Sequence, residues 1–393
     1  MDASPHSIVE EFQIAYAHRV YFTEGVFACA NPLLASTIKE CSSADKPRVF
    51  LVADAAFMAA NSGVSPKITE FFAYHREDIQ FLGAMELPGG EQLKNEPAFL
   101  EQLYRVIEQK KLCRHSYIIA LGGGALLDLV GYAASTAHRG IRHLRLPTTS
   151  LSQGDGGCGV KNGINYFGKK NFLGTFTPPT AVINDVDFLK SLPEARLVDG
   201  FIEAIKVSLI KDRSFFEYIE ANAEAILRRD FGIVRKVLEA SARHHVLHIA
   251  RNGDPFELTS SRPLDFGHWS AHKLEVLSEH ALSHGESVAI GIALDSIYSH
   301  RKGYLGEAEL GRILELIQKF GFRIYDEGLS ELTEGGEHVV LQGLEEFREH
   351  MGGKLTIPLL RDIGEQIEVN DMDLPLLLEC IENLRSREST VQT

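Results

Sequence analysis

The sequence predicts an α/β domain with a mostly parallel sheet, followed by a mostly α-helical domain. In the first half, short apolar segments that end at turn signals alternate with helical patterns, as is typical of a parallel sheet covered by helices. The segments predicted as buried strands are 48–54, 116–124, 143–149 and 181–189. After about residue 190, long apolar–polar periodicities of helical type replace this alternation. We therefore predict two domains, residues 1–190 and 191–393.

The second half contains three long helical patterns and little β signal. The patterns are EAIKVSLIKDRSFFEYIEANAEAIL, DFGIVRKVLEASARHHVLHIA and HGESVAIGIALDSIYSHRKGYL. A short apolar segment at 354–360, KLTIPLL, is the one later β signal. The helical domain is therefore expected to carry at most a small strand region.

Composition and charge narrow the class of partner. The 393 residues are 44% hydrophobic and 24% charged, which is ordinary for a globular protein. A net charge of −14 disfavours binding to nucleic acid or to an anionic membrane surface. The five cysteines are scattered, no segment is apolar enough to span a membrane, and the N-terminus is not a signal peptide. We expect a cytoplasmic protein with a small-molecule substrate.

The first domain contains candidate contacts for a dinucleotide. Glycines 122–124 separate a strand from a helix, so backbone N–H groups at a helix N-terminus can approach a pyrophosphate. A glycine turn of this kind is also common without a ligand. Asp54, at a strand end, accepts either ribose hydroxyls or the amides of the next helix. Glu91 and Lys94 are either a ribose contact or a surface ion pair. These features are consistent with NAD⁺ without establishing it.

The second domain contains candidate metal ligands. Glu203, His268 and His284 supply one carboxylate and two imidazoles, a set that suits catalytic Zn²⁺ with one coordination position left open. Any single histidine among the 16 in the chain is more often a surface or core residue than a ligand. The residue types alone therefore leave both interpretations open.

Several motifs together resemble a known family. The run GGGALLDLVGYAASTAHRGIRHLRLPTTSLSQGDGGCGVKNGIN is followed by GKKNFLGTF, GFIEAIKVSLI, FGHWSAHKLE and HGESVAIG. This series closely resembles the 3-dehydroquinate synthase superfamily, the sugar phosphate cyclases, over roughly residues 45–300. The resemblance implies a Rossmann-like NAD⁺-binding domain and a helical metal- and substrate-binding domain. It further implies a homodimeric carbon–oxygen lyase that uses NAD⁺ and Zn²⁺, with Co²⁺ as a substitute.

The resemblance also assigns roles residue by residue. The implied NAD⁺ contacts are Asp54, Glu91, Lys94, Gly123, Gly124, Asp128, Thr148, Thr149 and Lys170. The implied metal ligands are Glu203, His268 and His284, and the implied catalytic residues are Asp155, Lys161, Lys206, Asp265 and His272. The implied contacts of the substrate phosphate are Lys161, Asn171 and Arg139, the last reaching the neighbouring subunit's substrate.

The spacing of these residues suits the family's chemistry. Glu203 and Lys206 are i and i+3, and His268 and His272 are i and i+4, so each pair shares one face of a helix. One member of each pair can bind metal while the other points at substrate. In the family, a hydroxyl is oxidised, phosphate is eliminated, the ketone is reduced again, the ring opens and an aldol reaction closes a carbocycle.

Departures from 3-dehydroquinate synthase bear on the substrate. Asp265 replaces the family's asparagine, and a carboxylate accepts hydrogen bonds from hydroxyls but repels an anion. Arg262 lies one residue nearer the first histidine than the arginine expected there. Both changes favour a hydroxymethyl group over a carboxylate, as in sedoheptulose 7-phosphate, which related cyclases convert to valiolone-type C7 cyclitols. Asp265 together with His272 is most similar to 2-epi-valiolone synthases and EboD-type cyclases.

Three other interpretations stay open at this point. One is 3-dehydroquinate synthase itself, which acts on a C7 acid phosphate. Another is an NAD- and metal-dependent polyol dehydrogenase, which would accumulate NADH, whereas a cyclase releases phosphate without net NADH. The third is a non-catalytic binding protein descended from a cyclase.

Overall fold

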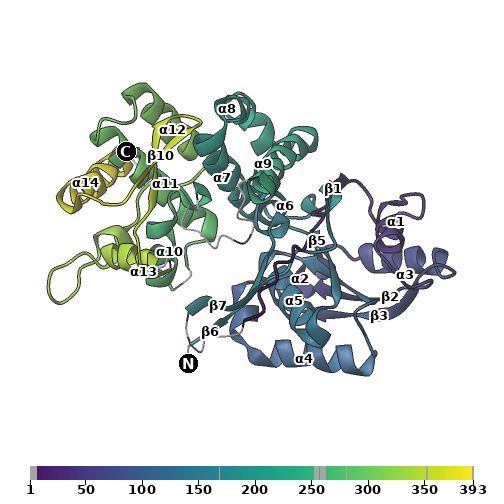
Figure 1. Cartoon of the computed structure of the whole chain (residues 1–393). Helices are drawn as coiled ribbons and strands as arrows, with labels where there is room; N and C mark the ends of the chain where they lie inside the picture. Colours follow the sequence, from purple (N-terminus) through teal and green to yellow (C-terminus); the bar gives the residue numbers. More distant parts are fainter. Residues whose placement is uncertain are drawn as a thin grey trace, which may run out of the picture.

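The computed structural model describes residues 7–167, 169–251, 256, 263–279, 281–350 and 353–391. Two lobes lie side by side, an α/β lobe that contains the large sheet and a mostly helical lobe (Figure 1). The predicted two-part fold class is confirmed. The predicted boundary near residue 190 falls between the short helix η4 (Val186–Leu189) and helix α7 (Glu194–Lys211).

The α/β lobe is built on a parallel sheet of six strands in the order β1-β8-β5-β4-β2-β3. In that order the strands are Val20–Thr23, Ala181–Asp185, Arg142–Pro147, Tyr117–Gly122, Arg48–Asp54 and Gln80–Leu87. Every residue of β4 and β8 is buried. Strands covered on both faces carry continuous apolar runs, which is why these segments were recognisable in the sequence.

The side chains of the central strands point alternately to the two faces of the sheet, and each face has its own apolar core. In β2 and β4, odd-numbered residues such as Leu51 and Ile119 pack with α1 (Leu33–Glu40) and α3 (Val64–Tyr74). Even-numbered residues such as Val52 and Ile118 pack instead with α4 (Pro97–Gln109) and α5 (Gly124–Thr136). Because successive side chains of a strand point to opposite faces, one apolar strand anchors both helical layers.

The sequence did not predict two edge strands and one hairpin. Strands β1 and β3 lie at the two edges of the sheet, and β3 is only partly buried. The antiparallel hairpin of β6 (Lys161–Tyr166) and β7 (Lys169–Phe176) consists largely of Lys, Asn and Gly. Edge and exposed strands bury few side chains, so they lack the apolar pattern that marks a central strand.

The helical lobe is centred on α7 and α11, whose side chains are buried on nearly all sides. Its helices after α7 are α8 (Arg213–Leu227), α9 (Phe231–Arg251), α10 (His268–Leu277), α11 (His284–Arg301), α12 (Glu307–Lys319), α13 (Gln342–His350) and α14 (Leu374–Val391). The predicted late β signal corresponds to β9 (Ile357–Asp362), which pairs with β10 (Glu365–Val369).

Shorter helices complete the chain. They are α2 (Ala55–Ala60), α6 (Ser150–Gly154), η1 (Glu91–Asn95), η2 (Ala137–Arg139), η3 (Gly156–Cys158), η5 (Pro263–Asp265), η6 (Glu327–Ser330) and η7 (Val339–Leu341). Among the described residues, no helix combines the length and the apolar character needed to cross a membrane.

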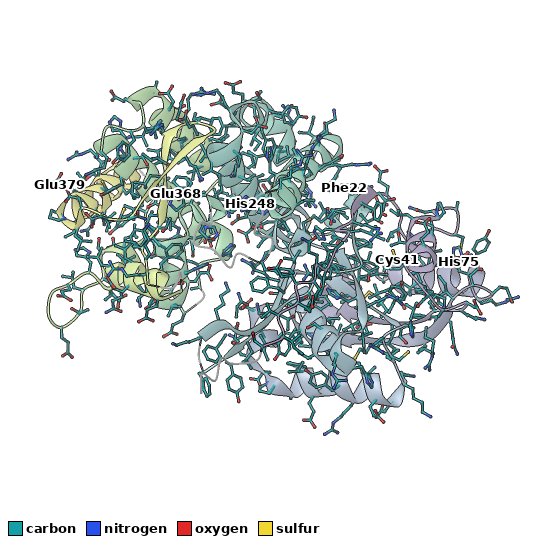
Figure 2. All side chains as sticks on the ribbon, in the orientation of Figure 1. Phe22, Cys41, His75, His248, Glu368 and Glu379 are labelled. Carbon is teal, nitrogen blue, oxygen red and sulfur yellow. The ribbon has the colours of Figure 1, made fainter. Side chains whose placement is uncertain are left out.

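A small apolar cluster joins the two lobes. Cys158, Val182 and Ala242 are fully buried together, and Phe22 packs against them from the sheet edge (labelled in Figure 2). Ala242 comes from α9, whereas Val182 belongs to β8. This contact holds α9 of the helical lobe against the six-stranded sheet.

Candidate active site

Three adjacent strands of the sheet end at one edge, and the predicted dinucleotide contacts lie there. Asp54 ends β2, Gly122 ends β4, and Thr148 follows β5 directly. The Thr148 amide donates to the Gly122 carbonyl at 3.0 Å. A Cβ on Gly123 would lie 3.3 Å from Cγ2 of Thr149. The glycine at the start of α5 therefore permits close approach between neighbouring turns at the carboxyl edge, where nucleotides bind in such sheets.

Asp54 serves as the cap of a helix. Its Oδ1 accepts hydrogen bonds from the amides of Ala56 at 2.8 Å and Phe57 at 3.1 Å, at the start of α2. Its Oδ2 faces Gly89, where an added Cβ would lie 2.2 Å from that oxygen. The capping interpretation therefore holds in the structure, and Gly89 keeps the loop close to the second carboxylate oxygen.

Glu91 and Lys94 belong to a buried polar network. Lys94 is 4% exposed, and its Nζ lies 2.8 Å from Asp128 Oδ2 and 3.6 Å from Glu91 Oε1. Nζ also donates to Asn171 Oδ1, and Asn165 donates to Glu91 at 3.0 Å. The alternative of a surface ion pair is wrong, because the ammonium group is buried. The structure places Asn171, expected at the substrate phosphate, among the residues expected to bind NAD⁺.

Arg145, which sequence reasoning missed, organises the loop between Asp155 and Lys161. The side chain is fully buried in β5. It donates to the carbonyls of Gly157 at 3.0 Å, Gly159 at 2.9 Å and Lys161 at 2.7 Å. The available signal was a cation inside the apolar strand HLRLP. A buried cation of this kind satisfies carbonyl groups that have no partner in a sheet or helix.

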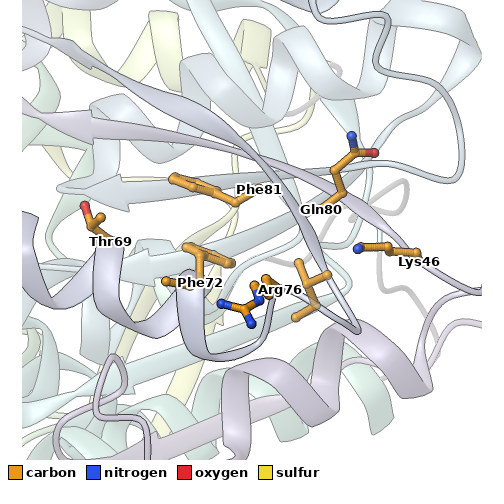
Figure 3. Close-up of a pocket in the computed structure, with 8 residues that line it drawn as sticks. Lys46, Thr69, Phe72, Arg76, Gln80 and Phe81 are labelled. Carbon is orange, nitrogen blue, oxygen red and sulfur yellow. The ribbon is translucent and has the colours of Figure 1, made fainter.

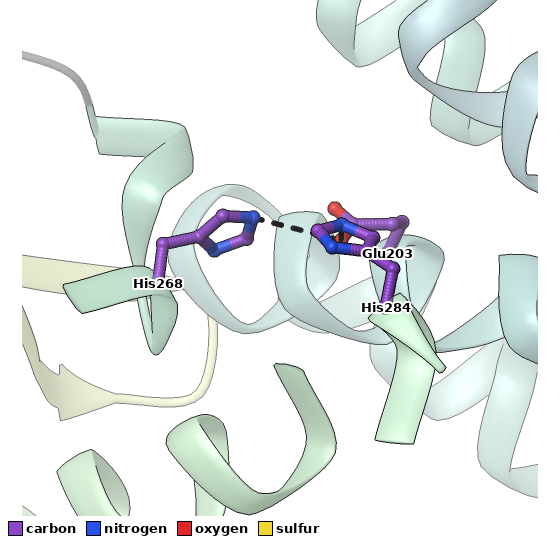
Figure 4. A group of neighbouring side chains, drawn as sticks. All are labelled: Glu203, His268 and His284. Carbon is purple, nitrogen blue, oxygen red and sulfur yellow. Dashed lines mark ion pairs between the residues drawn. The ribbon is translucent and has the colours of Figure 1, made fainter. Parts of the chain in front are cut away.

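The three predicted metal ligands converge from three helices (Figure 4). Glu203 lies within α7, whereas His268 and His284 are the first residues of α10 and α11. One ligand atom from each residue lies within 4.8 Å of the other two. His284 Nε2 is 3.3 Å and His268 Nε2 is 3.7 Å from Glu203 Oε1.

Both imidazoles are oriented as metal ligands usually are. His268 Nδ1 lies 3.1 Å from the Phe266 carbonyl oxygen, and His284 Nδ1 lies 2.6 Å from Glu275 Oε1. An acceptor at Nδ1 keeps the proton there and leaves the Nε2 lone pair for a metal. Glu203 is fully buried, its Oε2 forms an ion pair with Lys206, and its Oε1 faces both histidines. A buried carboxylate in this state fits a divalent cation such as Zn²⁺.

Backbone packing sets the position of His268. Gly267, immediately before α10, has φ of 76°, and a Cβ there would lie 2.6 Å from the amide nitrogen of Ile292 in α11. A side chain at this position would therefore separate the two histidine-bearing helices. Asp295 of α11 holds the same turn, because it accepts from the Gly267 amide at 3.0 Å and from Trp269 Nε1 at 2.9 Å.

The electrostatics of the cluster favour the ligand forms of Glu203 and His268. Burial lowers the pKa of His268 well below its ordinary value, so this ring is neutral. Burial opposes the charge on His284, but hydrogen bonds and charges from Glu203 and Glu275 raise its pKa to about 9, so a metal ion would displace a proton from this ring. Burial alone would raise the pKa of Glu203, but Lys206 and the two histidines hold it well below the ordinary value. Burial opposes the charge on Lys206, yet the Glu203 carboxylate raises the lysine pKa. The site therefore holds an ionised carboxylate beside a charged lysine.

Glu275, also missed from the sequence, links the metal cluster to the other lobe. One carboxylate oxygen contacts His284, and the other lies 2.9 Å from Nζ of Lys170 in β7. Burial would raise the pKa of Glu275, but hydrogen bonds and charges from His284 and Lys170 lower it. Lys170, expected to bind NAD⁺, is thus placed as a bridge between the hairpin and α10. The overlooked signal was a glutamate two turns after His268 on the same helix.

With this geometry in place, comparison with known proteins identifies the family. A family model described as the N-terminal part of 3-dehydroquinate synthase matches residues 84–199, and one described as its C-terminal part matches residues 200–334. The 3-dehydroquinate synthase of Halorhodospira halophila is 32% identical over 325 residues, covering 81% of this chain and 86% of the relative. The chain belongs to the 3-dehydroquinate synthase family. It is a member of the sugar phosphate cyclase superfamily.

Another relative and two solved structures agree with this membership. The 3-dehydroquinate synthase of Nitrosospira multiformis is 33% identical, covering 86% of this chain and 88% of the relative. ValA, a 2-epi-5-epi-valiolone synthase from Streptomyces hygroscopicus subsp. jinggangensis 5008 solved with NAD⁺ and Zn²⁺ bound, matches at a TM-score of 0.83 and 27% identity. The match covers 97% of this chain and 99% of ValA. The fold is also shared with a 2-deoxy-scyllo-inosose synthase that was solved with carbaglucose-6-phosphate, NAD⁺ and Co²⁺. That match has a TM-score of 0.72 at 20% identity and covers 93% of this chain and 96% of the other.

Two of the remaining catalytic candidates, Asp265 and His272, lie near the same cluster. Asp265, in η5, is close enough to Lys206 to raise the lysine pKa. The ring of His272 lies 5.3 Å from that of His268, and Lys161 begins β6. Arg262, whose displacement was noted in the sequence, lies outside the described residues.

Asp155 has a partner that the sequence did not suggest. Its Oδ1 lies 3.2 Å from Nδ1 of His245, on α9. Burial raises the pKa of Asp155, opposed by His245 and Lys206. The sequence offered only a histidine tract, HHVLH.

Arg139 lies away from the other candidates. It lines a surface hollow with Cys113, Arg114, His115, Thr136 and His138, segments that directly precede β4 and β5. This is the amino edge of the sheet, opposite the edge that carries Asp54 and Thr148. Arg139 therefore cannot join the site of its own chain.

A second hollow lies beside edge strand β3 (Figure 3). It is lined in part by Phe72 and Phe81, whose rings stack at 4.1 Å. It contains none of the predicted site residues, and we assign it no part in the chemistry.

Proposed function

We propose that this protein is a sugar phosphate cyclase that converts sedoheptulose 7-phosphate into a valiolone-type C7 cyclitol, with 2-epi-valiolone as the favoured product. The observation that carries the proposal is the Asp265 carboxylate near Lys206, beside the metal-ligand cluster. An acceptor at this position suits a substrate hydroxyl and disfavours a substrate carboxylate. The likeness to ValA supports the same substrate class.

We infer that the cofactors are NAD⁺ and Zn²⁺, or Co²⁺ in place of zinc. Glu203, His268 and His284 would hold the metal, and the carboxyl edge of the sheet would hold NAD⁺. ValA binds NAD⁺ and Zn²⁺, and the inosose synthase binds NAD⁺ and Co²⁺. When bound, these groups supply reversible oxidation and polarisation of an oxygen atom. The scattered free thiols favour a reducing, cytoplasmic compartment.

The side chains of this protein would then orient the substrate. Lys206 remains charged in a buried position, so it can donate hydrogen bonds to a substrate oxygen beside the metal. Asp265 would accept from hydroxyl groups, and Lys161 would contact the phosphate at the mouth of the hairpin. Product stereochemistry would depend on how these groups hold the open chain before the aldol step.

We also propose a homodimer in which Arg139 contacts the substrate phosphate of the neighbouring subunit. Its place at the amino edge of the sheet supports this role, because the residue cannot reach its own site. Exposed apolar side chains on the N-terminal segment and the β6–β7 hairpin support a protein interface. They are Ile8, Val9, Phe12, Ile14, Tyr16, Tyr166, Phe167, Phe172 and Phe176. Phe256 connects these two segments, with ring centroids 6.2 Å from Tyr16 and 5.4 Å from Phe176.

The deciding experiment is incubation with sedoheptulose 7-phosphate, NAD⁺ and Zn²⁺. We expect release of inorganic phosphate without accumulation of NADH, and an NMR spectrum of a C7 carbocycle. Accumulation of NADH without phosphate would instead indicate a polyol dehydrogenase. The absence of both phosphate and NADH would contradict the proposal.

A second candidate is 3-dehydroquinate synthase. Relatives of that name are 32–33% identical to this chain, and His272 is retained beside His268. Parallel assays with the C7 acid phosphate separate the two, because Asp265 should disfavour the substrate that carries a carboxylate.

A further inference from the structure

One buried histidine near the metal cluster has no role in the function proposed above. His245 is 5% exposed, and its Nδ1 lies 3.2 Å from Oδ1 of Asp155. Its Nε2 is buried and has no hydrogen-bond partner among the described residues. A buried polar atom without a partner costs about 1–3 kcal/mol. A lone atom of this kind beside the active-site residues is available to a ligand.

The position of His245 in α9 directs it to the active site. Ser241, one turn earlier on the same helix face, donates to the carbonyl of Gly154, the neighbour of Asp155, at 3.0 Å. Lys206 and Glu203 are both close enough to shift the pKa of His245. The imidazole thus belongs to the group formed by Asp155, Lys206 and the metal ligand Glu203, whereas the apolar side of α9 packs into the core.

The partner of Nδ1 defines what Nε2 can do. Burial lowers the pKa of His245, so the ring is neutral and carries one proton. A carboxylate only accepts hydrogen bonds, so Asp155 holds that proton on Nδ1. Nε2 then presents a lone pair, which pairs with a hydroxyl group and disfavours the oxygens of a carboxylate or phosphate.

We propose that His245 is a specificity-determining residue that accepts a hydrogen bond from a substrate hydroxyl through Nε2. Asp155 is the positioning residue that sets the tautomer. This inference rests on the proposed function, because it assigns a hydroxyl-bearing part of the polyol phosphate to His245. With Asp265, it gives the site two acceptors and thereby selects a polyhydroxylated substrate.

The test compares His245→Phe with His245→Gln. The glutamine amide reaches the position of Nε2 and retains a polar atom there, whereas phenylalanine fills the space without one. For phosphate release from sedoheptulose 7-phosphate, we expect His245→Phe to raise KM about tenfold, the loss of one hydrogen bond. His245→Gln should stay within about threefold of the wild-type KM. Bound zinc and the Kd for NAD⁺ should be unchanged in both, which a merely structural role would not predict.

Two outcomes separate this inference from the proposed function. Equal KM values for the two variants overturn the role of His245, even if the wild-type protein is a cyclase. If the wild-type protein uses only the C7 acid phosphate, the proposed function fails, and the same KM comparison on that substrate decides the inference. If neither substrate is turned over, the Kd of sedoheptulose 7-phosphate is measured instead, by titration calorimetry with the NAD⁺- and Zn²⁺-loaded wild type and variants. The absence of binding to the wild type would overturn both the role of His245 and the proposed function. His245→Leu replaces the phenylalanine variant if thermal unfolding shows that the larger ring disrupts the fold.

Discussion

The nucleotide edge and the metal cluster are assembled in different ways. At the nucleotide edge, Asp54 ends one strand, and Gly123 and Thr148 directly follow two neighbouring strands. The metal cluster joins Glu203, His268 and His284 from three separate helices. The first site depends mostly on main-chain geometry, which short sequence motifs encode. The second depends on side chains that meet only after the helices pack, so the residues that surround the three ligands are difficult to predict from sequence.

The largest expected effect comes from removing a metal ligand. Glu203→Gln should abolish most bound zinc and lower phosphate release by roughly a thousandfold, because the site loses its single anionic ligand. Metal analysis of the purified protein and a phosphate assay measure both. Glu194→Gln, on the exposed first turn of the same helix, is the control. Full activity with undiminished zinc would contradict the ligand assignment.

The next largest effect concerns the loop between Asp155 and Lys161, whose main-chain carbonyls Arg145 holds. Arg145→Met leaves the carbonyls of Gly157, Gly159 and Lys161 without a donor. We expect the free energy of unfolding to fall by about 3 kcal/mol. Urea denaturation measures this change. The matched control, Arg105→Met, removes an exposed ion pair with Glu101 and should change stability little. Equal stability of the two variants would show that Arg145 does not hold the loop.

A smaller effect is expected at Glu275, which contacts His284 in the metal cluster and forms an ion pair with Lys170 of the hairpin. Glu275→Ala should weaken zinc binding by about 10- to 100-fold, because His284 loses the acceptor at Nδ1. Competition with a chelator measures the zinc Kd. Lys170→Met should weaken it less, since Glu275 still reaches His284. Glu279→Gln, an exposed change just beyond α10, controls for charge. Unchanged zinc affinity in Glu275→Ala would show that Glu275 does not position His284.

The smallest predicted effect concerns the choice of substrate. Asp265→Asn replaces an acceptor with a group that also donates, so it should lower kcat/KM for sedoheptulose 7-phosphate about tenfold. The ratio of kcat/KM for this substrate and for the C7 acid phosphate is the measurement. An unchanged ratio would remove the main argument for a polyol substrate.

The success of sequence reasoning follows from where each residue lies. The central strands were predictable because buried parallel strands carry continuous apolar runs, as β4 and β8 do. Edge strands and the β6–β7 hairpin were missed because they are less buried than the central strands. The three ligand candidates were found through a motif resemblance, and the structure brings them within reach of one ion.

The residues that support the site were not predicted, since each contact joins different secondary-structure elements. Arg145 reaches a loop that begins eleven residues later, and His245 contacts Asp155 from another lobe. Glu275 joins Lys170 to His284. The local signals, a cation within an apolar strand and a glutamate two turns after His268, do not identify the partner, because a polar residue on a helix gives the same periodicity whether it faces solvent or another side chain.

The sequence by itself determined the two-part fold, the turn chemistry of the nucleotide edge and the identity of the ligand-bearing motifs. These depend on local rules, namely apolar periodicity and the backbone freedom of glycine. Tertiary structure alone decided which nitrogen of each histidine is available, which carboxylates remain ionised and which buried atoms lack a partner. Those properties depend on burial and on distances between segments far apart in the chain, and both arise only when the helices and the sheet pack together.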